Sequence, residues 1–486
     1  MDRLVRIDRG TVRGDEVDGV VAFKSIPYAA APVGAGRFAL PQPPTWSGEW
    51  DARQSGPTAP QASGRLPGLN LTSLLDVGWV AGPDYLSASV WTPGGGGLPV
   101  LVFVHGGAFV GGSGTASGYG GTAFARDGVV LVSINYRLGV PGFAAIPGAP
   151  NNRGLYDQIA ALQWVRENIA AFGGDPDNVT IFGESAGGIS VATLVAGAPE
   201  GLFRRAICES GGGSHALTEP QAAAVTAALV GHLGVPAEDF AEVSDVDLVA
   251  AVAWLGTQRL DLRVDGVADP LMGLAKFGPV IDGDLLDGQP VGALAPGVEV
   301  MVGNNADEIN LYAVALPAPP LDADALRLAV SRLHPDPDAV VEAYRSAGRG
   351  GTLAELLAAI GTDYVFGIPA LRMADAHAAQ PAGTWRYEFT WRSPAYEGRL
   401  GACHGLELPF VFDTVSTVDH GSLGVPDNDE TRALATEIHA AWVAFALTGD
   451  PGWPRYTPAD PVVRRLGPDP GTAVDGPERS LWSGIR

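Results

Sequence analysis

The sequence predicts an α/β protein with a large, mostly parallel β-sheet covered by helices on both faces. Short, wholly apolar runs recur along the chain, and such runs are typical of strands buried between two layers of helices. Segments with helical periodicity separate these runs, which is the order of elements in α/β folds. The chain has 486 residues, of which 46% are hydrophobic, so it can bury a large core.

Six mainly apolar runs are the predicted strands of this sheet. They occupy residues 99–104, 128–134, 179–182, 205–208, 298–302 and 384–391. Several end at turns rich in glycine or asparagine, so the ends of these strands are well marked.

Two helices are predicted on either side of the 179–182 strand. The first shows one apolar face, formed by Leu155, Ile159, Leu162 and Ile169. Asn151 or Asn152 can cap its start, and the glycine pair at 173–174 can end it. The second helix follows the strand over residues 186–195.

Two further segments, residues 216–275 and 320–380, are predicted to be mostly helical. We expect them to be insertions that cap the active edge of the sheet. The sequence contains no internal repeat, and the glycine-rich turn at 94–97 is too short to be a domain linker. The prediction is therefore a single domain over residues 1–486.

The net charge argues against two classes of partner. The chain has 54 Asp and Glu against 31 Lys and Arg, which gives a formal charge of −23. Such a surface repels nucleic-acid phosphates and anionic lipid, so we expect neither a nucleic acid nor a membrane as partner.

The chain has two cysteines, Cys208 and Cys403. They form no disulfide framework and no zinc pattern, although one bridge between them is compatible with the sequence. The amino terminus lacks the apolar core of a signal peptide, and no uncharged apolar stretch is long enough to span a bilayer. We therefore expect a cytoplasmic protein, with no metal or other cofactor.

The segment Gly-Glu-Ser-Ala-Gly at residues 183–187 follows a predicted strand directly. Two glycines at this spacing let the chain turn sharply from strand to helix and present the hydroxyl of Ser185 above the sheet. The same pattern fits an ordinary tight turn. A nucleophilic serine also requires a base, an acid and donors for an oxyanion elsewhere in the chain.

The candidate donors lie in the loop 105–109, His-Gly-Gly-Ala-Phe, which also follows an apolar strand. Lipases and esterases of the α/β-hydrolase type use such a loop together with the amide after the nucleophile. The candidate oxyanion hole is therefore formed by the N–H groups of Gly107, Ala108 and Ala186. We expect His105 to be structural.

The candidate base is His404, which lies on a loop after the 384–391 strand. The order serine, acid, histidine then places the acid after the 298–302 strand. Asp307 and Glu308 both lie there, and local chemistry does not choose between them.

These motifs belong to a longer pattern, which resembles the type-B carboxylesterase family. This family includes bacterial para-nitrobenzyl esterases and the cholinesterases, and the resemblance covers nearly the whole chain. The other matching segments are residues 19–29, 32–34, 37–38, 135–139, 154–164, 172–176, 278–283 and 441–451.

The resemblance implies an α/β-hydrolase fold with helical cap insertions, and it assigns the site residues. It implies Glu308 as the acid and His404 as the base, with Ser210 and Glu184 as supporting residues. Ile309 is a departure, because the family usually has glycine at this position. The family also implies no metal or cofactor.

A second departure concerns the loop over the active site. Secreted relatives have cysteines near Ala59 and Tyr85, and both are absent here. The resemblance therefore predicts a more mobile span at 63–81 and agrees with a reducing compartment.

The implied reaction is hydrolysis of small-molecule carboxylic esters through an acyl-enzyme, by a monomer or a small homo-oligomer. Five aromatic residues are candidates for the substrate pocket: Trp79, Phe109, Phe277, Phe366 and Phe410. Two alternatives are an adhesion-type relative without catalysis and an amidase or peptidase on the same fold. The intact Ser185, Glu308 and His404 argue against the first, and the full-length resemblance argues against the second.

Overall fold

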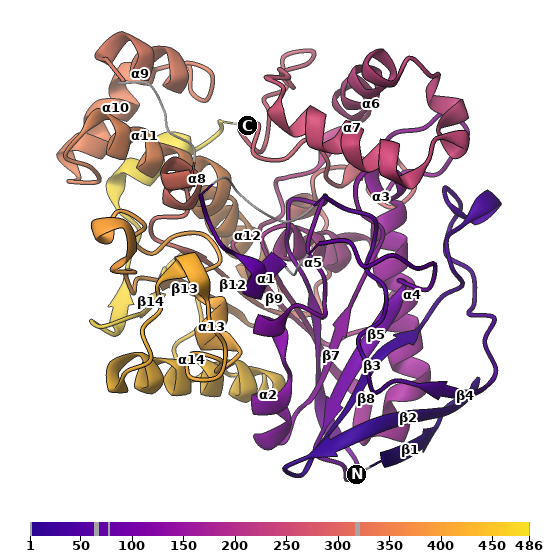
Figure 1. Ribbon diagram of the computed structural model, residues 1–486. Helices are drawn as coiled ribbons and strands as arrows, with labels where there is room; N and C mark the ends of the chain where they lie inside the picture. Colours follow the sequence, from indigo (N-terminus) through magenta and orange to yellow (C-terminus); the bar gives the residue numbers. More distant parts are fainter. Residues whose placement is uncertain (1, 63–67, 76–77, 316–320, 486) are drawn as a thin grey trace.

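A single large sheet organises the molecule (Figure 1). The structure is a computed structural model that describes residues 2–62, 68–75, 78–315 and 321–485. Within these residues the sheet has thirteen strands, with β4 (Gly48–Asp51) paired to β2 outside the main order. The main order is β1 (Asp2–Arg6), β2 (Gly10–Val17), β3 (Val20–Pro27), β5 (Ser87–Thr92), β7 (Val130–Ile134), β6 (Leu98–Val104), β8 (Gly174–Glu184), β9 (Arg205–Glu209), β12 (Glu299–Asn305), β13 (Thr384–Phe389), β14 (Val463–Leu466) and β15 (Gly471–Ala473).

The middle of the sheet is parallel, as the sequence predicts. Every neighbouring pair from β7 to β14 is parallel, and the six predicted strands are β6, β7, β8, β9, β12 and β13. The strands at the amino-terminal edge pair antiparallel. A search for apolar runs misses β1 and β2 because they are partly exposed, and in β1 no residue is buried. It misses β5 for another reason, since this strand is fully buried but contains Ser87, Ser89 and Thr92.

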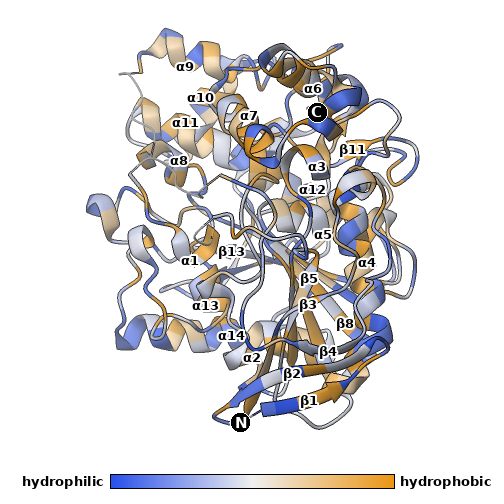
Figure 2. Cartoon of the chain, turned by 45° about the vertical axis from the view of Figure 1, so that its right-hand side comes forward, coloured by the Kyte–Doolittle hydropathy of each residue, from blue (hydrophilic) through white to orange (hydrophobic). Residues whose placement is uncertain are grey.

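The sheet is buried on both faces. Along β6, Val100, Val102 and Val104 belong to one hydrophobic cluster, and Leu101 and Phe103 belong to the other. Side chains alternate between the two faces of a strand, so each cluster lies on its own side of the sheet. Figure 2 shows orange, apolar strands in the sheet and helices in which blue and orange residues are mixed.

Helices α4 (Arg153–Asn168) and α5 (Ala186–Gly197) contribute to the first cluster, and α14 (Asp429–Thr448) contributes to the second. The predicted helix ends are close to those observed, since Gly173 has a left-handed φ of 91° after α4 and its last turn. The predicted cap is wrong in detail. Asn152 stands at the start of α4, but its side chain does not cap the helix and instead bonds Val280 and Asp282.

The two predicted insertions contain two groups of helices, which lie at the top of Figure 1 except for the last helix of the second group, which lies lower and beside the sheet. The first group is α6 (Glu219–Leu233) and α7 (Asp245–Thr257), after which residues 258–275 contain no α-helix. The second group is α9 (Ala323–Val330), α10 (Pro337–Ser346), α11 (Leu353–Thr362) and α12 (Ile368–Ala378). The span predicted to be mobile, 63–81, includes residues 63–67 and 76–77, which lie outside the described part of the chain.

Helices α11 and α12 join through a π-helical turn, Asp363–Gly367, into one helical run of 26 residues. By length and composition alone this run could cross a membrane, which the sequence analysis does not anticipate. However, 72% of its most apolar window is buried inside the protein. A core helix gives the same signal, so the run is weak evidence for a membrane span.

Candidate active site

Ser185 stands on a sharp turn between β8 and α5. Its φ of 58° and ψ of −122° are unusual for a residue other than glycine. A Cβ atom at Gly183 or Gly187 would lie 2.6 Å or 2.0 Å from the carbonyl oxygen of Val104, so both positions exclude a side chain. The two glycines of the motif are therefore required by the close approach of β6, and the turn is not an ordinary one.

Ser185, His404 and Glu308 form a continuous hydrogen-bonded chain. The hydroxyl of Ser185 lies 2.7 Å from Nε2 of His404. On the other side of the ring, Nδ1 of His404 lies 2.6 Å from Oε2 of Glu308. These residues are far apart in sequence and come from the ends of β8, β12 and the loop after β13, which the parallel sheet brings to one edge.

Glu308 is held from several directions. Its Oε1 accepts hydrogen bonds from the Ser210 hydroxyl at 2.6 Å and from the Asn305 backbone N–H at 2.7 Å. The side chain is fully buried. Ser210 therefore supports His404 through Glu308, and no hydrogen bond between Ser210 and the imidazole is present among the described residues.

Asp307 has a different role from Glu308. It accepts hydrogen bonds from Arg392 and from the N–H of Ala402, and so links the β12 end to the His404 loop. The unusual Ile309 does not displace Glu308, whose Oε2 lies 2.6 Å from Nδ1 of His404. The Ile309 N–H donates to the hydroxyl of Thr362 at 3.2 Å. The side chain of Ile309 lies against Gly361 in α11.

The loop of candidate oxyanion donors has a left-handed backbone. Gly107, Ala108 and Phe109 have φ values of 110°, 54° and 62°. A Cβ at Gly107 would lie 2.1 Å from the oxygen of Gly111, so only glycine fits. Ala186 is the first residue of α5, where a backbone N–H has no partner within the helix. Available N–H groups thus flank the serine.

His105 lies in this loop but serves its backbone. Its ring bonds the carbonyl of Gly106 at 2.8 Å and stacks on Tyr136, with ring centres 4.5 Å apart. The Tyr136 hydroxyl in turn donates to the His105 carbonyl. These contacts agree with the predicted structural role.

Burial and charge act in opposite directions on His404. Burial lowers the pKa of the imidazole, but the carboxylates of Glu184 and Glu308 outweigh it and raise this pKa to about 9. Glu184 Oε1 lies 3.2 Å from Nε2 of His404. Burial also raises the pKa of the Glu184 carboxyl to about 7. Glu184 therefore acts electrostatically on His404 and also directly precedes Ser185.

Three further residues near the site are missed by the sequence analysis. Glu209 and Glu407 are fully buried, and burial raises the pKa of both carboxyls. The pKa of Glu209 is raised to about 8. The Tyr312 ring lies 5.7 Å from the His404 ring. Their positions in the sequence offer a signal: Glu209 directly precedes Ser210, and Glu407 follows His404 by three residues.

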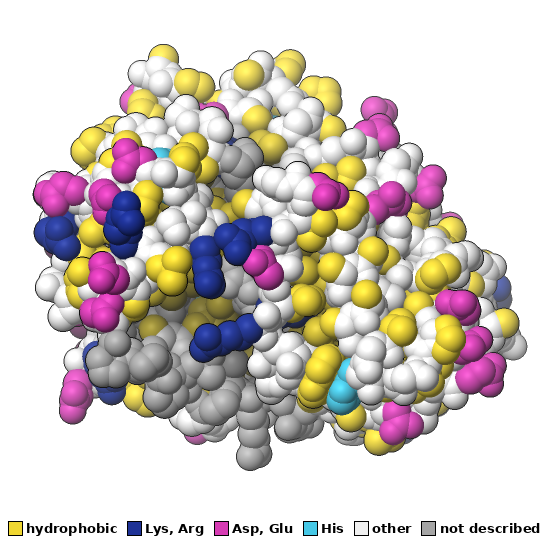
Figure 3. Space-filling model, turned by 90° about the horizontal axis from the view of Figure 1, so that it is seen from above, with side chains coloured by type: hydrophobic (Ala, Val, Ile, Leu, Met, Phe, Trp, Pro, Cys, Tyr) yellow, Lys and Arg dark blue, Asp and Glu magenta, His cyan; other side chains and the backbone are white. Residues whose placement is uncertain are grey.

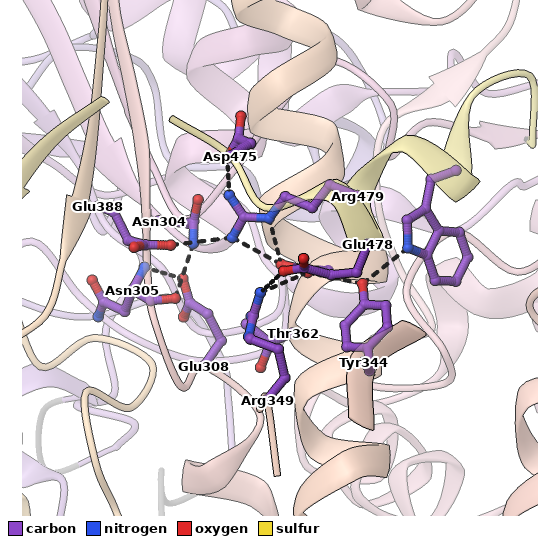
Figure 4. A network of polar contacts seen from close by, with 12 residues as sticks. Asn304, Asn305, Glu308, Tyr344, Arg349, Thr362, Glu388, Asp475, Glu478 and Arg479 are labelled. Carbon is purple, nitrogen blue, oxygen red and sulfur yellow. Dashed lines mark hydrogen bonds and ion pairs between the residues drawn. The ribbon is translucent and has the colours of Figure 1, made fainter. Parts of the chain in front are cut away.

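A buried network of ion pairs holds an element that packs on the site (Figure 4). Arg479, near the carboxy terminus, pairs with Asp363, Glu388 and Asp475. Asp363 begins the π-helical turn that joins α11 to α12. The same turn carries Phe366, whose ring lies 4.8 Å from the His404 ring. The network therefore fixes the element that packs on the imidazole.

The five pocket candidates have different locations. Phe366 contacts His404, and Phe109 follows the oxyanion loop but is fully buried against Phe143. Phe277 is also buried, and no described ring contact joins it to the site. The remaining two are corrections. Phe410 packs on Phe389 and Trp391 in the core, and Trp79 lines a separate cavity beside Arg37.

Comparisons with known proteins agree with this geometry. A model of the carboxylesterase family matches residues 1–474. The chain belongs to this family. It is a carboxylic ester hydrolase with the α/β-hydrolase fold, and the adhesion-type alternative is not favoured.

This carboxylesterase is similar to several characterised proteins. It is 37% identical to para-nitrobenzyl esterase of Bacillus subtilis (strain 168), over 93% of this chain and 92% of that one. It is 34% identical to phenmedipham hydrolase of Pseudarthrobacter oxydans, over 96% and 95%. A solved PNB esterase superposes with a TM-score of 0.85 at 33% identity over 100% of both chains. A carboxylesterase from Geobacillus stearothermophilus gives 0.85 at 35% identity over 99% of both.

Proposed function

We propose that Ser185 is the nucleophile of this carboxylesterase, with His404 as general base and Glu308 as the acid that orients it. The observation that carries the proposal is the chain of two short hydrogen bonds, 2.7 Å from Ser185 to His404 and 2.6 Å from His404 to Glu308. Both imidazole nitrogens are thus engaged, which fixes the ring for proton transfer.

The reaction follows from these positions. Ser185 Oγ attacks the ester carbonyl while Nε2 of His404 accepts the hydroxyl proton. The N–H groups of Gly107, Ala108 and Ala186 stabilise the oxyanion. The alcohol then leaves with the proton from His404, and the acyl group remains on the serine. Water repeats these steps on the acyl-enzyme and releases the carboxylic acid.

The proposed substrates are small, moderately apolar esters. The described surroundings of His404 support this, because Phe366 and Tyr312 place aromatic rings on it. Figure 3 shows hydrophobic side chains scattered over the face that carries the caps, with basic side chains near its centre and also, beside acidic ones, at its left edge. Two of the relatives above are also named for small molecules, para-nitrobenzyl esters and phenmedipham.

The test is hydrolysis of para-nitrophenyl acetate, butyrate and octanoate by the wild type and by Ser185→Ala. We expect turnover by the wild type and loss of several orders of magnitude in the variant, whose fold is checked by circular dichroism. Full activity of the folded variant contradicts the proposal. A matched ester and anilide then test the amidase alternative, since we expect the ester to react much faster.

We also propose that the protein works in a reducing compartment such as the cytoplasm. The support is that Cys208 and Cys403 are both buried and unpaired. Separate cytoplasmic and extracellular fractions of the native cells would test this by immunoblot, and an extracellular signal alone contradicts it.

A further inference from the structure

One turn of the chain contacts the surroundings of both the proposed acid and the proposed base. It is the π-helical turn Asp363–Gly367, together with Thr362 directly before it. The Thr362 hydroxyl accepts the N–H of Ile309, the residue that follows the acid, at 3.2 Å. Four residues later, the Phe366 ring lies against the His404 ring, with centres 4.8 Å apart and planes inclined by 38°. The position of this turn therefore affects two of the three proposed catalytic groups.

Asp363 anchors the turn between these two contacts. Its side chain has no exposed surface, and both carboxylate oxygens are engaged. Arg479 lies 3.0 Å from one oxygen, and the other accepts from the Tyr344 hydroxyl at 2.8 Å and from Arg349 at 3.3 Å. Burial opposes ionisation, but the two guanidiniums outweigh it and lower the pKa of the Asp363 carboxyl. The turn is thus held by a buried, ionised carboxylate.

Arg479 connects this carboxylate to two other parts of the fold. It lies in the short helix Pro477–Trp482, and its side chain is only 5% exposed. Besides Asp363, its guanidinium pairs with Asp475 and with Glu388 of β13 (Figure 4). Three carboxylates around one rigid fork fix the direction of each of them.

The pair with Glu388 leads back to the proposed acid. Glu388 lies opposite Asn304 in the register of β13 and β12. The next residue of β12, Asn305, donates its N–H to the carboxylate of Glu308 at 2.7 Å. Arg479 therefore holds the end of β13 beside the strand that carries the acid, as well as the turn that contacts the base.

Stability alone is a weak explanation for this arrangement. Buried ion pairs are often no more stabilising than apolar side chains of similar size. π-helical turns are uncommon, and they occur frequently at functional sites. Here the charges surround such a turn, and the turn contacts the imidazole.

We propose that Arg479 is a positioning residue of the esterase reaction, which holds the turn 363–367 through Asp363 so that Phe366 fixes the ring of His404. The proposal rests on the proposed function, in which His404 is the base. Nε2 must accept the proton of Ser185 and then give it to the leaving alcohol, so the ring has to keep one orientation. Displacement of the turn should therefore lower kcat more than it raises KM.

The first test moves Asp363 without removing a charge. Gly367 has a helical φ of −65° and ψ of −46°, so alanine suits its backbone. A Cβ there would lie 2.6 Å from Oδ1 of Asp363 and 3.4 Å from Arg479, so the carboxylate has to shift. We expect Gly367→Ala to lower kcat for para-nitrophenyl butyrate about tenfold. Gly231→Ala in α6 is the matched control, because its Cβ meets no atom within 4 Å, and it should leave kcat unchanged.

The second test changes the guanidinium itself. Arg479→Lys keeps the positive charge but loses the fork, so we expect kcat to fall, and Arg479→Gln should lose more. Arg205→Lys is the control: Arg205 is 3% exposed and pairs with Glu299, and both are the first residues of their strands, away from the edge that carries the site. Thermal stability should fall in both lysine variants, but kcat should fall only in Arg479→Lys. Wild-type kcat in both Gly367→Ala and Arg479→Lys overturns the proposal.

A double variant tests whether the effect passes through Phe366. In the Phe366→Ala background, Arg479→Lys should change kcat by less than a factor of about two, because the ring that transmits the displacement is gone. Its effect on thermal stability should remain. An equal fold-loss of kcat with and without Phe366 overturns the proposed route from Arg479 to His404.

Active-site titration separates these results from a failure of the proposed function. Ser185 Oγ attacks the phosphorus of diethyl 4-nitrophenyl phosphate, His404 takes the hydroxyl proton, and 4-nitrophenolate leaves. One equivalent released by the wild type and none by Ser185→Ala supports the nucleophile, whatever the Arg479 variants do. The same titration gives the concentration of intact sites in each variant, so that kcat is calculated per site.

Discussion

Two buried charge clusters in this esterase differ in how completely their polar atoms are paired. In the first, Arg137 and Asp157 both have no exposed side-chain surface. The Arg137 guanidinium donates to both carboxylate oxygens of Asp157 and to the carbonyls of Arg37 and Ala39. Its charge and its donors are thus matched by neighbours of fixed position.

The cluster around His404 lacks this balance. One imidazole faces the carboxyls of Glu184 and Glu308, and Glu209 and Glu407 are buried nearby. Oε2 of Glu209 and Oε1 of Glu407 have no hydrogen-bond partner among the described residues. The difference separates two uses of buried charge: the first cluster holds elements together, and the second shifts pKa values where the proposed mechanism moves a proton.

Among the variants that test this difference, we expect the largest change in kcat from Glu308→Gln. The amide cannot orient and stabilise the His404 imidazolium, so we expect kcat to fall by about 10³–10⁴-fold with little loss of stability. Asp307→Asn is the matched control, because Asp307 bonds Arg392 and Ala402 instead of His404. An equal loss in both variants, measured with para-nitrophenyl butyrate, would falsify the assignment of Glu308.

Asp157→Asn should lower stability and leave kcat nearly unchanged, which is the opposite of the result expected for Glu308→Gln. It leaves the Arg137 charge buried without its partner, so we expect the free energy of unfolding to fall by about 3–5 kcal/mol. The kcat of the protein that remains folded should change little. Urea denaturation measures the free energy of unfolding. Active-site titration gives the concentration of folded enzyme by which kcat is calculated. Asp51→Asn, in an exposed pair with Arg53, should leave stability close to that of the wild type.

A pH profile tests the electrostatics of the second cluster. The proposed mechanism needs neutral His404, and the carboxylates raise its pKa to about 9, so kcat/KM should rise with pH toward an alkaline midpoint. Glu184→Gln removes one of these carboxylates. Its midpoint should therefore move to lower pH, which increases the fraction of neutral imidazole at pH 7. A midpoint that stays in place means that Glu184 does not act on His404.

The sequence predicts six strands of the sheet from their mainly apolar runs, which are typical of strands between two layers of helices. It misses β5, which is also buried at every residue, because Ser-Ala-Ser-Val-Trp-Thr mixes polar and apolar residues. It also predicts that Ser185 and His404 meet, since both follow strands of one parallel sheet. Local chemistry does not choose between Asp307 and Glu308, because both are carboxylates. Only the folded chain shows that Glu308 points to His404 and Asp307 to Arg392. Phe410 and Trp79 fail as pocket predictions for the same reason, since residue type carries no direction.

The smallest expected effect concerns the residue that departs from the family pattern. A Cβ at Gly361 would lie 3.2 Å from Cγ1 of Ile309 and 3.4 Å from Cε of Met272, so Gly361→Ala crowds the helix against the residue next to Glu308. We expect overpacking to cost about 1–2 kcal/mol of stability. Ile309→Ala should relieve it, so the double variant should be more stable than the sum of the single effects predicts. Additive free energies from urea denaturation would show that Ile309 and Gly361 do not press on each other. In that case the Thr362 hydroxyl, which accepts the Ile309 N–H, is left as the contact that holds this turn and the position of Glu308.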